Sequence, residues 1–518
     1  MTWDVTAMAR QWAGDAANYG MVLMSPNENN SANYRVYPSS ENPDGLDVPM
    51  LSATFSPLEG PVTVQPAGSG GVEVFTAPAN WKSNTLQMAE AQAHALSVAQ
   101  DRVDANPAAL GAPSLDMVSG QVTVPAATAD GRDIGRAPLS GTAYLANGAT
   151  DWSVAGEYVG EVGEDDGDGP ANLSEPFTFS PTTPDVANSA ARLTEIVDEV
   201  LGLTTEQMPS ADLLVSAFIW PERNLVVLQA PSVTPELRQA LAARYGLNAV
   251  AIWLQPSARQ PAADVLTRSG PRAVSAMAGD SRDNDTDGYI NGGSRYFGSP
   301  GGECTTGWAW GKAADMLLLV GGHCMPMNGG RVARRVDGNI LGALSVYPEE
   351  DSNWDTRVGT VKLPGQSTYY GDVARLHVDY RSTASIFVGP AGSSDKRSVA
   401  GRWSRRAQDG DLYCVGGVNS GQTCNWKVAG IGWKIKNGTK TTRWVQRGTR
   451  ANRCTKRGDS GAPVYTIRSS DGYVVAKGIH HGSLKNEDGT DMTENCEAYF
   501  TDIHDVGLAF GDRIMKRN

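Results

Sequence analysis

Cysteine is absent from the first 303 residues of this 518-residue chain, so no disulfide can stabilise that part. The six cysteines that follow contain no CxxC pair, which argues against a structural zinc site or a thioredoxin-like redox motif. Long apolar runs are also lacking, and none reaches the ~18 residues of a membrane-spanning helix. The first residues, MTWDVTAMARQW, have neither the basic nor the apolar region of a signal peptide. The sequence therefore predicts no membrane span and contains no export signal.

Basic residues are scarce in the first part of the chain. Residues 1–280 hold 13 Lys and Arg against 32 Asp and Glu, a net charge of −19. Residues 281–518 hold 31 against 25, a net charge of +6. The total of −13 argues against a general nucleic-acid binder, because such proteins neutralise phosphates with Lys and Arg. Two interpretations of the asymmetry remain: parts that attract each other electrostatically, or unrelated domains with different surfaces.

Glycine and proline are abundant, with 58 and 29 residues. Because both residues interrupt regular secondary structure, this composition favours many short strands over long helices. The length predicts several domains, since a domain typically has roughly 100–200 residues. An apolar fraction of 40% provides enough material for buried cores and excludes disorder of the whole chain.

The six cysteines are confined to the last part of the chain, and an even number there indicates disulfides and an oxidising compartment. About fifteen pairings are possible. The sequential one is attractive because each bridge closes a short loop and can add ~2–4 kcal/mol of stability. Disulfides conflict with the missing export signal, and we expect a truncated N-terminus and a secreted protein. The sequential pairs are Cys304–Cys324, Cys414–Cys424 and Cys454–Cys496.

The chain upstream of the cysteines divides into four segments. Residues 1–58 predict short strands separated by Asn, Gly, Asp and Pro. Residues 59–187 are a mixed region of uncertain fold, with a helix expected over residues 85–104. Residues 188–262 predict a small α+β module, and residues 263–280 a linker.

The α+β module has the clearest element signals. Apolar residues at helical spacing predict a first helix that ends at Gly202. Thr234 followed by Pro235 predicts the start of a second helix, which ends at Gly246. Two apolar runs flank Pro221-Glu222-Arg223 and predict a hairpin, and AVAIWLQ predicts a last strand.

The strongest chemical signal is the run Gly458-Asp459-Ser460-Gly461. Glycines around a serine permit a tight turn that exposes the hydroxyl and points backbone N–H groups at one place. Because a serine hydroxyl is a weak nucleophile, it needs a base and an acid that orients the base. His323 follows the apolar run Met316–Val320 and is the candidate base, and Asp372 opens an apolar strand between the two. The order His, Asp, Ser is that of chymotrypsin.

Alternatives exist for each of these residues. Asp355 and Asp379 compete with Asp372 as the orienting acid, although no apolar strand follows either directly. The structural interpretations are a buried His that ends a strand, a capping Asp and a turn Ser.

These motifs resemble the secreted, chymotrypsin-like serine peptidases of the actinobacterial streptogrisin and α-lytic type. The resemblance covers residues 281–518, about 240 residues, with the motifs in the family's order. It rests on CTTGWAWGKAADMLLLVGGHC, YYGDVARLHV, CVGGVNSGQTC, CTKRGDSGAPV, and AKGIHHGS with Cys496 downstream.

The resemblance implies a multi-domain chain with a C-terminal all-β double β-barrel, and the family's sequential disulfides. It also implies peptide hydrolysis through an acyl-enzyme, with no cofactor and no metal ion. Carried over to this sequence, Ser460 is the nucleophile, His323 the general base and Asp372 the acid that orients the imidazole. The backbone N–H groups of Gly458 and Ser460 would form the oxyanion hole, worth about 10²–10³ in rate per donor.

The sequence departs from the family pattern near the triad. Val320-Gly321 replaces the usual Thr-Ala before Gly-His, and Ala462 replaces the second glycine after the serine. His481 stands where a serine normally supports the catalytic Asp, which leaves the surroundings of the acid uncertain.

By the same resemblance, the primary substrate pocket includes Arg457, His480 and Ser483. None offers a carboxylate for a Lys or Arg substrate. A His and a Ser at these places resemble the glutamyl-specific members, since imidazolium, hydroxyl and guanidinium groups can hold a carboxylate. The alternative is a pocket for medium apolar side chains, with Arg457 a solvated rim residue and His480 a packed wall residue.

The upstream segments also show weak resemblances. Residues 188–262 lie where these peptidases carry a pro-region, and AFIWPERNLVVLQ is loosely similar to its hairpin. Residues 1–58 resemble the last third of the jelly-roll domain of bacterial surface proteins with a DNRLRE signature, and predict a partial β-sandwich. We expect cleavage between about residues 263 and 300, where Arg268, Arg272 and Arg282 should be exposed.

Two functions from different classes follow. The first is a secreted serine endopeptidase made as a precursor, with an intramolecular pro-region and with proteins or peptides as substrates. The second is a catalytically inactive, surface-associated binding protein on the same scaffold, whose residues 1–58 bind the cell wall or a glycan.

Overall fold

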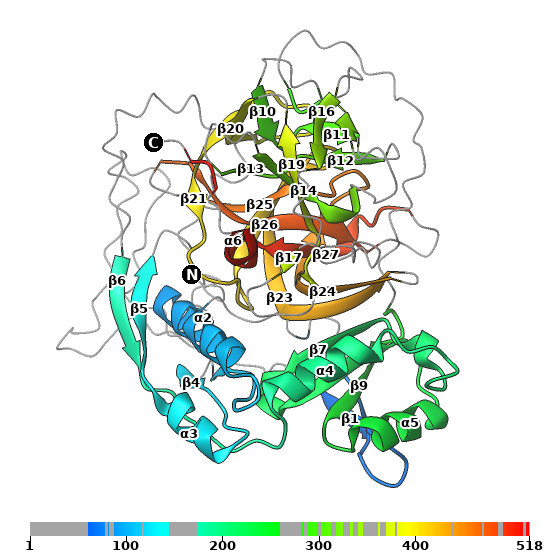
Figure 1. Cartoon of the computed structure of the whole chain (residues 1–518). Coiled ribbons are helices and arrows are strands. Elements are labelled where there is room, and N and C mark those ends of the chain that lie inside the picture. Colours follow the sequence, from blue (N-terminus) through cyan, green and yellow to red (C-terminus); the bar gives the residue numbers. More distant parts are fainter. Residues whose placement is uncertain are drawn as a thin grey trace, which may run out of the picture. The chain divides into compact units, whose positions relative to one another are not determined.

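The computed structural model of the chain is shown in Figure 1. The chain divides into two compact units, Met1–Glu59 and Gly60–Asn518, and every described residue belongs to the second. The predicted jelly-roll segment 1–58 therefore lies outside the described residues. Among the residues described, no helix is long and apolar enough to cross a membrane. The structure describes residues 61–77, 81, 88–116, 119–144, 174–258, 281–283, 289–297, 302–311, 317–324, 332–334, 340–344, 361–362, 369–378, 381–437, 440–468, 471–484, 490–510 and 514–516.

The last part of the chain contains a seven-stranded antiparallel sheet and part of a larger sheet whose central ring is antiparallel, each with its own core. The first has seven strands and packs buried residues such as Tyr296, Leu318 and Leu376 against the Cys304–Cys324 pair. Its strand order is β12 (Glu303–Thr305), β11 (Arg295–Phe297), β15 (Val332–Arg334), β16 (Ile340–Leu344), β19 (Val373–Val378), β14 (Leu317–Gly321) and β13 (Ala309–Trp310).

The second sheet contains a closed ring of six antiparallel strands, because β24 pairs with both β23 and β27. A buried cluster that includes Trp426, Val464 and Phe500 fills it, and α6 (Ile503–Phe510) follows its last strand. The two sheets form the predicted chymotrypsin-like double β-barrel. Around the ring the strands are β22 (Leu412–Gly417), β23 (Gly421–Asn437), β24 (Lys440–Asn452), β27 (Glu494–Asp502), β26 (Val474–Ser483) and β25 (Pro463–Ile467).

The α+β segment has the helices and strands that its sequence predicts. Side chains of Ser189 and Thr234 accept hydrogen bonds from the first turns of α4 (Ala190–Val200) and α5 (Pro235–Tyr245). The second helix ends at Gly246, whose φ of 93° suits glycine. Between the helices, β7 (Ser216–Trp220) and β8 (Leu225–Ala230) form the predicted hairpin, and β9 (Val250–Leu254) pairs parallel with β8.

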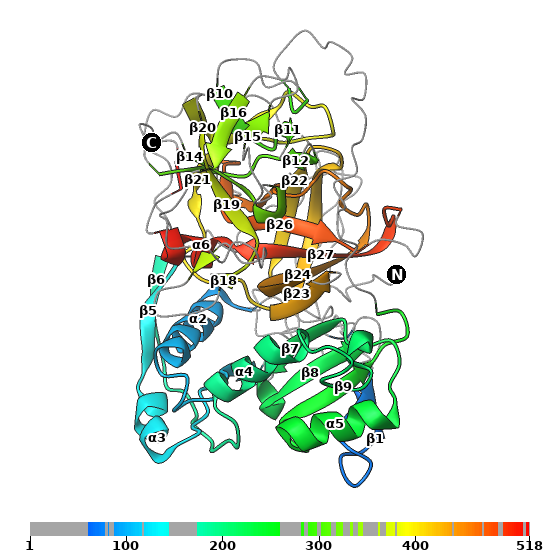
Figure 2. The same ribbon diagram turned by 45° about the vertical axis from the view of Figure 1, so that its right-hand side comes forward.

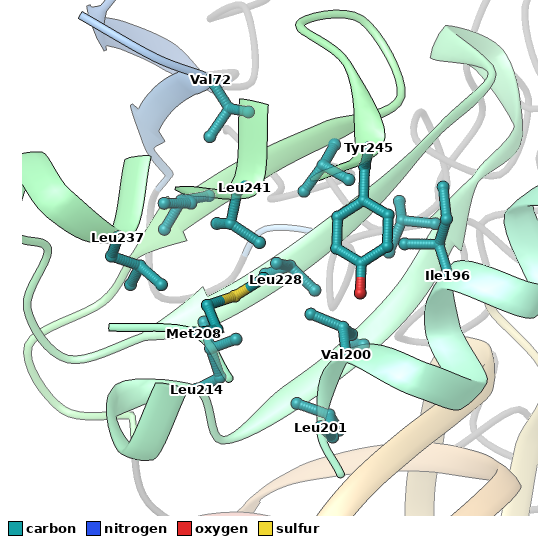
Figure 3. Close-up of a cluster of buried hydrophobic side chains, with 14 of the residues drawn as sticks. Val72, Ile196, Val200, Leu201, Met208, Leu214, Leu228, Leu237, Leu241 and Tyr245 are labelled. Carbon is teal, nitrogen blue, oxygen red and sulfur yellow. The ribbon is translucent and has the colours of Figure 1, made fainter. Parts of the chain in front are cut away.

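Both helices cover the same face of this sheet (Figure 2). Figure 3 shows their apolar side chains meeting there: Ile196 and Val200 come from α4, and Leu237 and Leu241 from α5. Leu228 of β8 lies between them and is fully buried. The helical spacing that predicted the helices is thus the spacing of this core.

The expected boundary at residue 188 does not separate the two upstream segments. β2 (Glu73–Thr76) pairs parallel with β9 and antiparallel with β1 (Val62–Gln65), so residues before 188 complete the sheet that follows. A parallel pairing across more than 170 residues leaves no local sequence signal, so the sequence alone could not place β2 in this sheet. The remaining elements share a separate core: α2 (Glu90–Ala105), β3 (Ser114–Asp116), β4 (Gln121–Thr123), α3 (Ala129–Arg136), β5 (Leu139–Tyr144) and β6 (Ser174–Phe179).

The upstream part, residues 61–258, is joined to the double barrel through backbone hydrogen bonds. β7 pairs antiparallel with β23, with Ser216 opposite Ile435 and Ala217 opposite Lys434. Next to this pairing, the rings of Phe218 and Trp433 stack with centroids 4.4 Å apart. The upstream sheet and the second barrel are consequently one continuous 14-stranded sheet.

Arg282 contradicts the expectation that residues 263–300 are exposed throughout. Its side chain is 0% exposed. The guanidinium donates to the carbonyls of Gly416 at 3.1 Å and Phe387 at 2.8 Å. Arg282 is therefore part of the double-barrel core; Arg268 and Arg272 lie outside the described residues. Sequence alone missed this because a buried Arg that pairs with carbonyls looks like any surface Arg.

Candidate active site

The register of two neighbouring strands brings His323 and Asp372 together. β14 pairs antiparallel with β19, and Gly321 at the end of β14 lies opposite Val373 at the start of β19. His323 follows in the single 3₁₀ turn η5 (Gly322–Cys324). The residue after one strand and the residue before the other must therefore lie side by side, so backbone pairing fixes their approach.

Asp372 is fully buried and accepts hydrogen bonds from two histidines. Its Oδ1 accepts the backbone N–H of His323 at 2.8 Å, and its Oδ2 contacts His323 Nδ1. The same Oδ2 contacts Nδ1 of His481 at 2.5 Å. The backbone N–H of Asp372 donates to Thr501 Oγ1 at 2.8 Å. A neutral imidazole that donates from Nδ1 keeps Nε2 as an acceptor, which is the tautomer a general base needs.

The electrostatics of this site favour an ionised acid. Burial raises the pKa of Asp372, but the charges and hydrogen bonds of His323 and His481 outweigh it and hold that pKa well below the usual carboxyl value. The competing acids, Asp355 and Asp379, lie outside the described residues. Among the residues described, Asp372 is the carboxylate that faces His323.

Ser460 reaches the same place from the second barrel. The N–H of Gly461 donates to the carbonyl of His480 at 2.8 Å, which ties the serine loop to β26. The hydroxyl of Ser460 donates to the carbonyl of His481 at 3.2 Å. His481 thus contacts Ser460 through its carbonyl and Asp372 through its ring. The departure noted in the sequence, a His in place of a Ser, lies at the centre of the site.

Gly461 and Gly321 allow the two barrels to approach each other closely at this point. A Cβ on Gly461 would lie 2.4 Å from the carbonyl oxygen of Thr305 and 2.8 Å from the nitrogen of Gly321. Its φ of 88° also disfavours other residues. Glycine is therefore required after the serine, where the serine loop meets Thr305 and Gly321.

The candidate oxyanion-hole donors, the N–H groups of Gly458 and Ser460, are oriented by the carbonyls that precede them. The carbonyl of Arg457 accepts Asn419 Nδ2 at 2.8 Å. The carbonyl of Asp459 accepts a backbone N–H three residues further on at 3.0 Å. A trans peptide directs its N–H away from its carbonyl. Each N–H group consequently points away from the contact that its preceding carbonyl makes.

The carboxylate of Asp459 holds the loop from within. It is fully buried and accepts the backbone N–H groups of Lys456, Asn419 and Ser420 at 2.7, 2.8 and 3.2 Å. Burial raises the pKa of Asp459, although these three donors favour its ionised form. The loop geometry therefore depends on a buried acid that is not part of the triad.

Sequence reasoning missed further supporting residues. Thr305 donates from Oγ1 to the carbonyl of Gly458 at 2.8 Å and from its backbone to that of Ser460 at 2.8 Å. Thr501 and Asn419 hold Asp372 and the serine loop, as described above. These contacts join residues far apart in the sequence, and Thr and Asn are common in turns, so no local pattern identifies them.

The structure places the three candidate pocket residues differently. His480 and Ser483 are buried on β26, whereas Arg457 is exposed. The hydroxyl of Ser483 contacts that of Thr455, and the backbone N–H of Arg457 donates to Asp491 at 3.2 Å. Their role in binding substrate stays a prediction.

The sequential disulfide pairing is confirmed. The bridges join residues 20, 10 and 42 positions apart, all within the double barrel. One of them, Cys304–Cys324, includes the neighbour of His323 and so fixes the turn that carries the imidazole.

In the part of the chain that the structure describes, one group of side chains has the composition of a metal site. His323, Asp372 and His481 each offer one ligand atom, and these atoms lie within 4.8 Å of one another. The hydrogen bonds of the two imidazoles to Asp372 account for this geometry without an ion.

Comparison with known sequences finds no matching family model and no matching curated protein. Comparison with solved structures finds bacterial serine proteases at low similarity. The chain is similar to the chymotrypsin of Cellulomonas bogoriensis, with 18% identity over 44% of this chain and 100% of that one, and a TM-score of 0.31. It is similar to a glutamic acid-specific serine protease described as using a histidine triad in substrate binding, with 17% identity, 43% and 100% coverage, and a TM-score of 0.33. The Nocardiopsis protease NAPase gives 19% identity, 44% and 100% coverage, and a TM-score of 0.31.

Proposed function

We propose that this protein is a serine endopeptidase that hydrolyses peptide bonds through an acyl-enzyme. The observation that carries the proposal is Asp372, which holds both the backbone and the ring of His323 in a fixed orientation. Ser460 stands in the same cluster of hydrogen bonds, on a loop with two oriented N–H groups. A base held by an acid, a serine and paired N–H donors together suit acyl transfer.

The proposed mechanism assigns one step to each group. Nε2 of His323 takes the proton of Ser460 as Oγ attacks the scissile carbonyl, and then gives it to the leaving amine. Asp372 stabilises the imidazolium that forms. The N–H groups of Gly458 and Ser460 bind the oxyanion of the tetrahedral intermediate. Water then attacks the acyl-enzyme, with His323 again as the base.

A labelling experiment separates this function from an inactive binding protein. An organophosphonate that reacts with activated serines should label one residue, Ser460, and the label should be located by mass spectrometry of the digested protein. Absence of labelling in the folded protein would favour the binding protein.

We further propose that the protein acts outside the cell and is made as a precursor. Three disulfides suit an oxidising compartment. Residues 61–258 add strands to the edge of the barrel, an arrangement suited to a pro-region that assists folding or blocks the site.

The buried Arg282 narrows the expected cleavage site. Cutting after it would require removal of its guanidinium from the carbonyls of Gly416 and Phe387, so we expect the stable enzyme to begin between residues 263 and 281. N-terminal sequencing of the active product tests this. A fully active product that begins near residue 1, or one that begins after Arg282, contradicts the prediction.

The pocket prediction concerns His480. If its imidazole holds a substrate carboxylate, His480→Val should lower kcat/KM for cleavage after Glu by roughly 10- to 100-fold, because a charge-assisted hydrogen bond is lost. Cleavage after Leu should change little. A peptide pair that differs only in this residue measures both, and Arg457→Gln tests the exposed guanidinium separately. Negligible wild-type cleavage after Glu, or no effect of the change, would support the apolar pocket instead.

A further inference from the structure

Helix α2 carries a stripe of polar residues along one side. Glu90, His94, Ser97, Asp101 and Asp104 are spaced by four, three, four and three positions, so they lie on one face of the helix. Four of these five can carry charge, and three of them are carboxylates. A polar face on an otherwise apolar-packed helix indicates a polar partner.

The partner of this stripe is a short segment of the peptidase part, Ser404-Arg405-Arg406. Glu90 accepts two hydrogen bonds from the Arg405 guanidinium, at 2.6 and 3.0 Å. His94 Nε2 lies 3.3 Å from the hydroxyl of Ser404. Arg405 is 1% exposed and the side chain of Glu90 is 7% exposed, so their ion pair is almost fully buried. The two residues are 315 positions apart in the sequence.

The C-terminal half of the stripe contacts Arg406. The Arg406 guanidinium contacts Asp101 and lies 3.1 Å from Asp104. The backbone N–H of Arg406 donates to the hydroxyl of Ser97 at 3.2 Å. The helix therefore contacts both side-chain and backbone groups of this segment.

The peptidase part alone does not neutralise these arginines. Arg405 shares Asp411 with Lys477, and Arg406 pairs with Asp505. The third nearby acid, Asp502, has a pKa raised to about 7 by burial and by Asp505, so it carries only part of a charge at neutral pH. Three cations, Arg405, Arg406 and Lys477, thus share Asp411 and Asp505 on this side, and the carboxylates of α2 supply further negative charge.

We propose that Ser404–Arg406 is a docking site for the acidic stripe of α2, which retains residues 61–258 on the peptidase after the chain between them is cut. This contact is chemically distinct from the pairing of β7 with β23, because it consists of ion pairs and not of backbone ladder bonds. The inference rests on the proposed precursor, in which the two parts become separate chains. Its occupant is α2 of the same chain.

The groups around His94 give this contact a pH dependence. Burial lowers the pKa of His94 to about 4, with Arg405 acting in the same direction and Glu90 and Asp411 opposing it. His504, on the facing helix α6, has a pKa also lowered to about 4 by burial and by Arg406. Asp104 has a raised pKa and opposes the effect. His94 regains an ordinary pKa when α2 leaves, so docking is complete above about pH 6.5 and weakens as the pH falls towards 4.

The test uses the full chain with Ser460→Ala, so that the result does not depend on activity. The linker, which contains Arg268 and Arg272, is cut with trypsin, and mass spectrometry confirms the cut. Gel filtration over a series of salt concentrations and pH values then measures how much of the upstream part stays bound.

Glu90→Gln with Asp101→Asn should weaken retention about tenfold or more, since each change removes a charge-assisted hydrogen bond. Asp130→Asn with Asp133→Asn, on exposed positions of α3, removes the same charge outside the stripe and should have no effect. Retention equal to this control at all salt concentrations would overturn the proposal.

A double-mutant cycle of Asp101→Asn and Arg406→Gln adds a second measurement. Amide hydrogen exchange of residues 404–411 in the uncut chain should rise in both single variants and by no more in the double variant. Effects that simply add would show that the two residues do not act together, which also contradicts the proposal. Failure of peptide hydrolysis in the wild type would affect neither measurement.

Discussion

Ser460→Ala should abolish peptide hydrolysis while the protein stays folded. Removal of the nucleophile leaves only the oxyanion hole and substrate binding, and we expect turnover to fall by a factor on the order of 10⁶. The change removes one buried oxygen, whose hydrogen bond to the carbonyl of His481 is 3.2 Å long. Initial rates with a chromogenic peptide measure the effect.

Two controls make this result decisive. Ser257→Ala changes an exposed serine of the upstream part and should retain full activity. Circular dichroism and the three disulfides, checked by mass spectrometry, should be the same in both variants. Hydrolysis by Ser460→Ala near the wild-type rate would show that another residue is the nucleophile.

Asp372→Asn should lower kcat by a factor of about 10⁴, with little change in KM. The asparagine amide can donate to Nδ1 of His323, which then becomes an acceptor and leaves the proton on Nε2. An imidazole protonated at Nε2 cannot accept the proton of Ser460, although every group is still in place.

Asp372 has two histidine partners, so a variant of the second histidine, His481, serves as a comparison. His481→Asn keeps a side-chain N–H donor without a ring, and we expect a much smaller loss in kcat than with Asp372→Asn. Asp130→Asn, remote on α3, should have no effect. A loss in kcat of less than tenfold for Asp372→Asn would favour Asp355 or Asp379 as the orienting acid.

Local sequence patterns predicted the features of this fold that depend on residues close together in the sequence. The run around Ser460 needs glycines because of its own turn, and the caps at Ser189 and Thr234 act within one helix turn. The approach of His323 to Asp372 was also predictable, since each lies at the end of an apolar strand.

Contacts between distant segments could not be predicted in this way. Nothing in the sequence around Arg282 distinguishes a buried guanidinium from a solvated one. The pairing of β2 with β9 and of Arg405 with Glu90 depends on the assembled fold. Attraction between the parts was one of two interpretations of the charge asymmetry, and the ion pairs of Arg405 with Glu90 and of Arg406 with Asp101 join the two parts.

The pairing of β7 with β23 has a consequence for solubility. Trp433, Ile435 and Val445 of the β23–β24 hairpin are fully buried, and Phe218 and Trp253 of the upstream part belong to the same apolar cluster. Departure of residues 61–258 would leave this hairpin with an unpaired strand edge and bare aromatic surface, the combination that promotes edge-to-edge association. We then expect the uncut chain to stay monomeric at high concentration, and the shortened chain to associate with itself or with other surfaces.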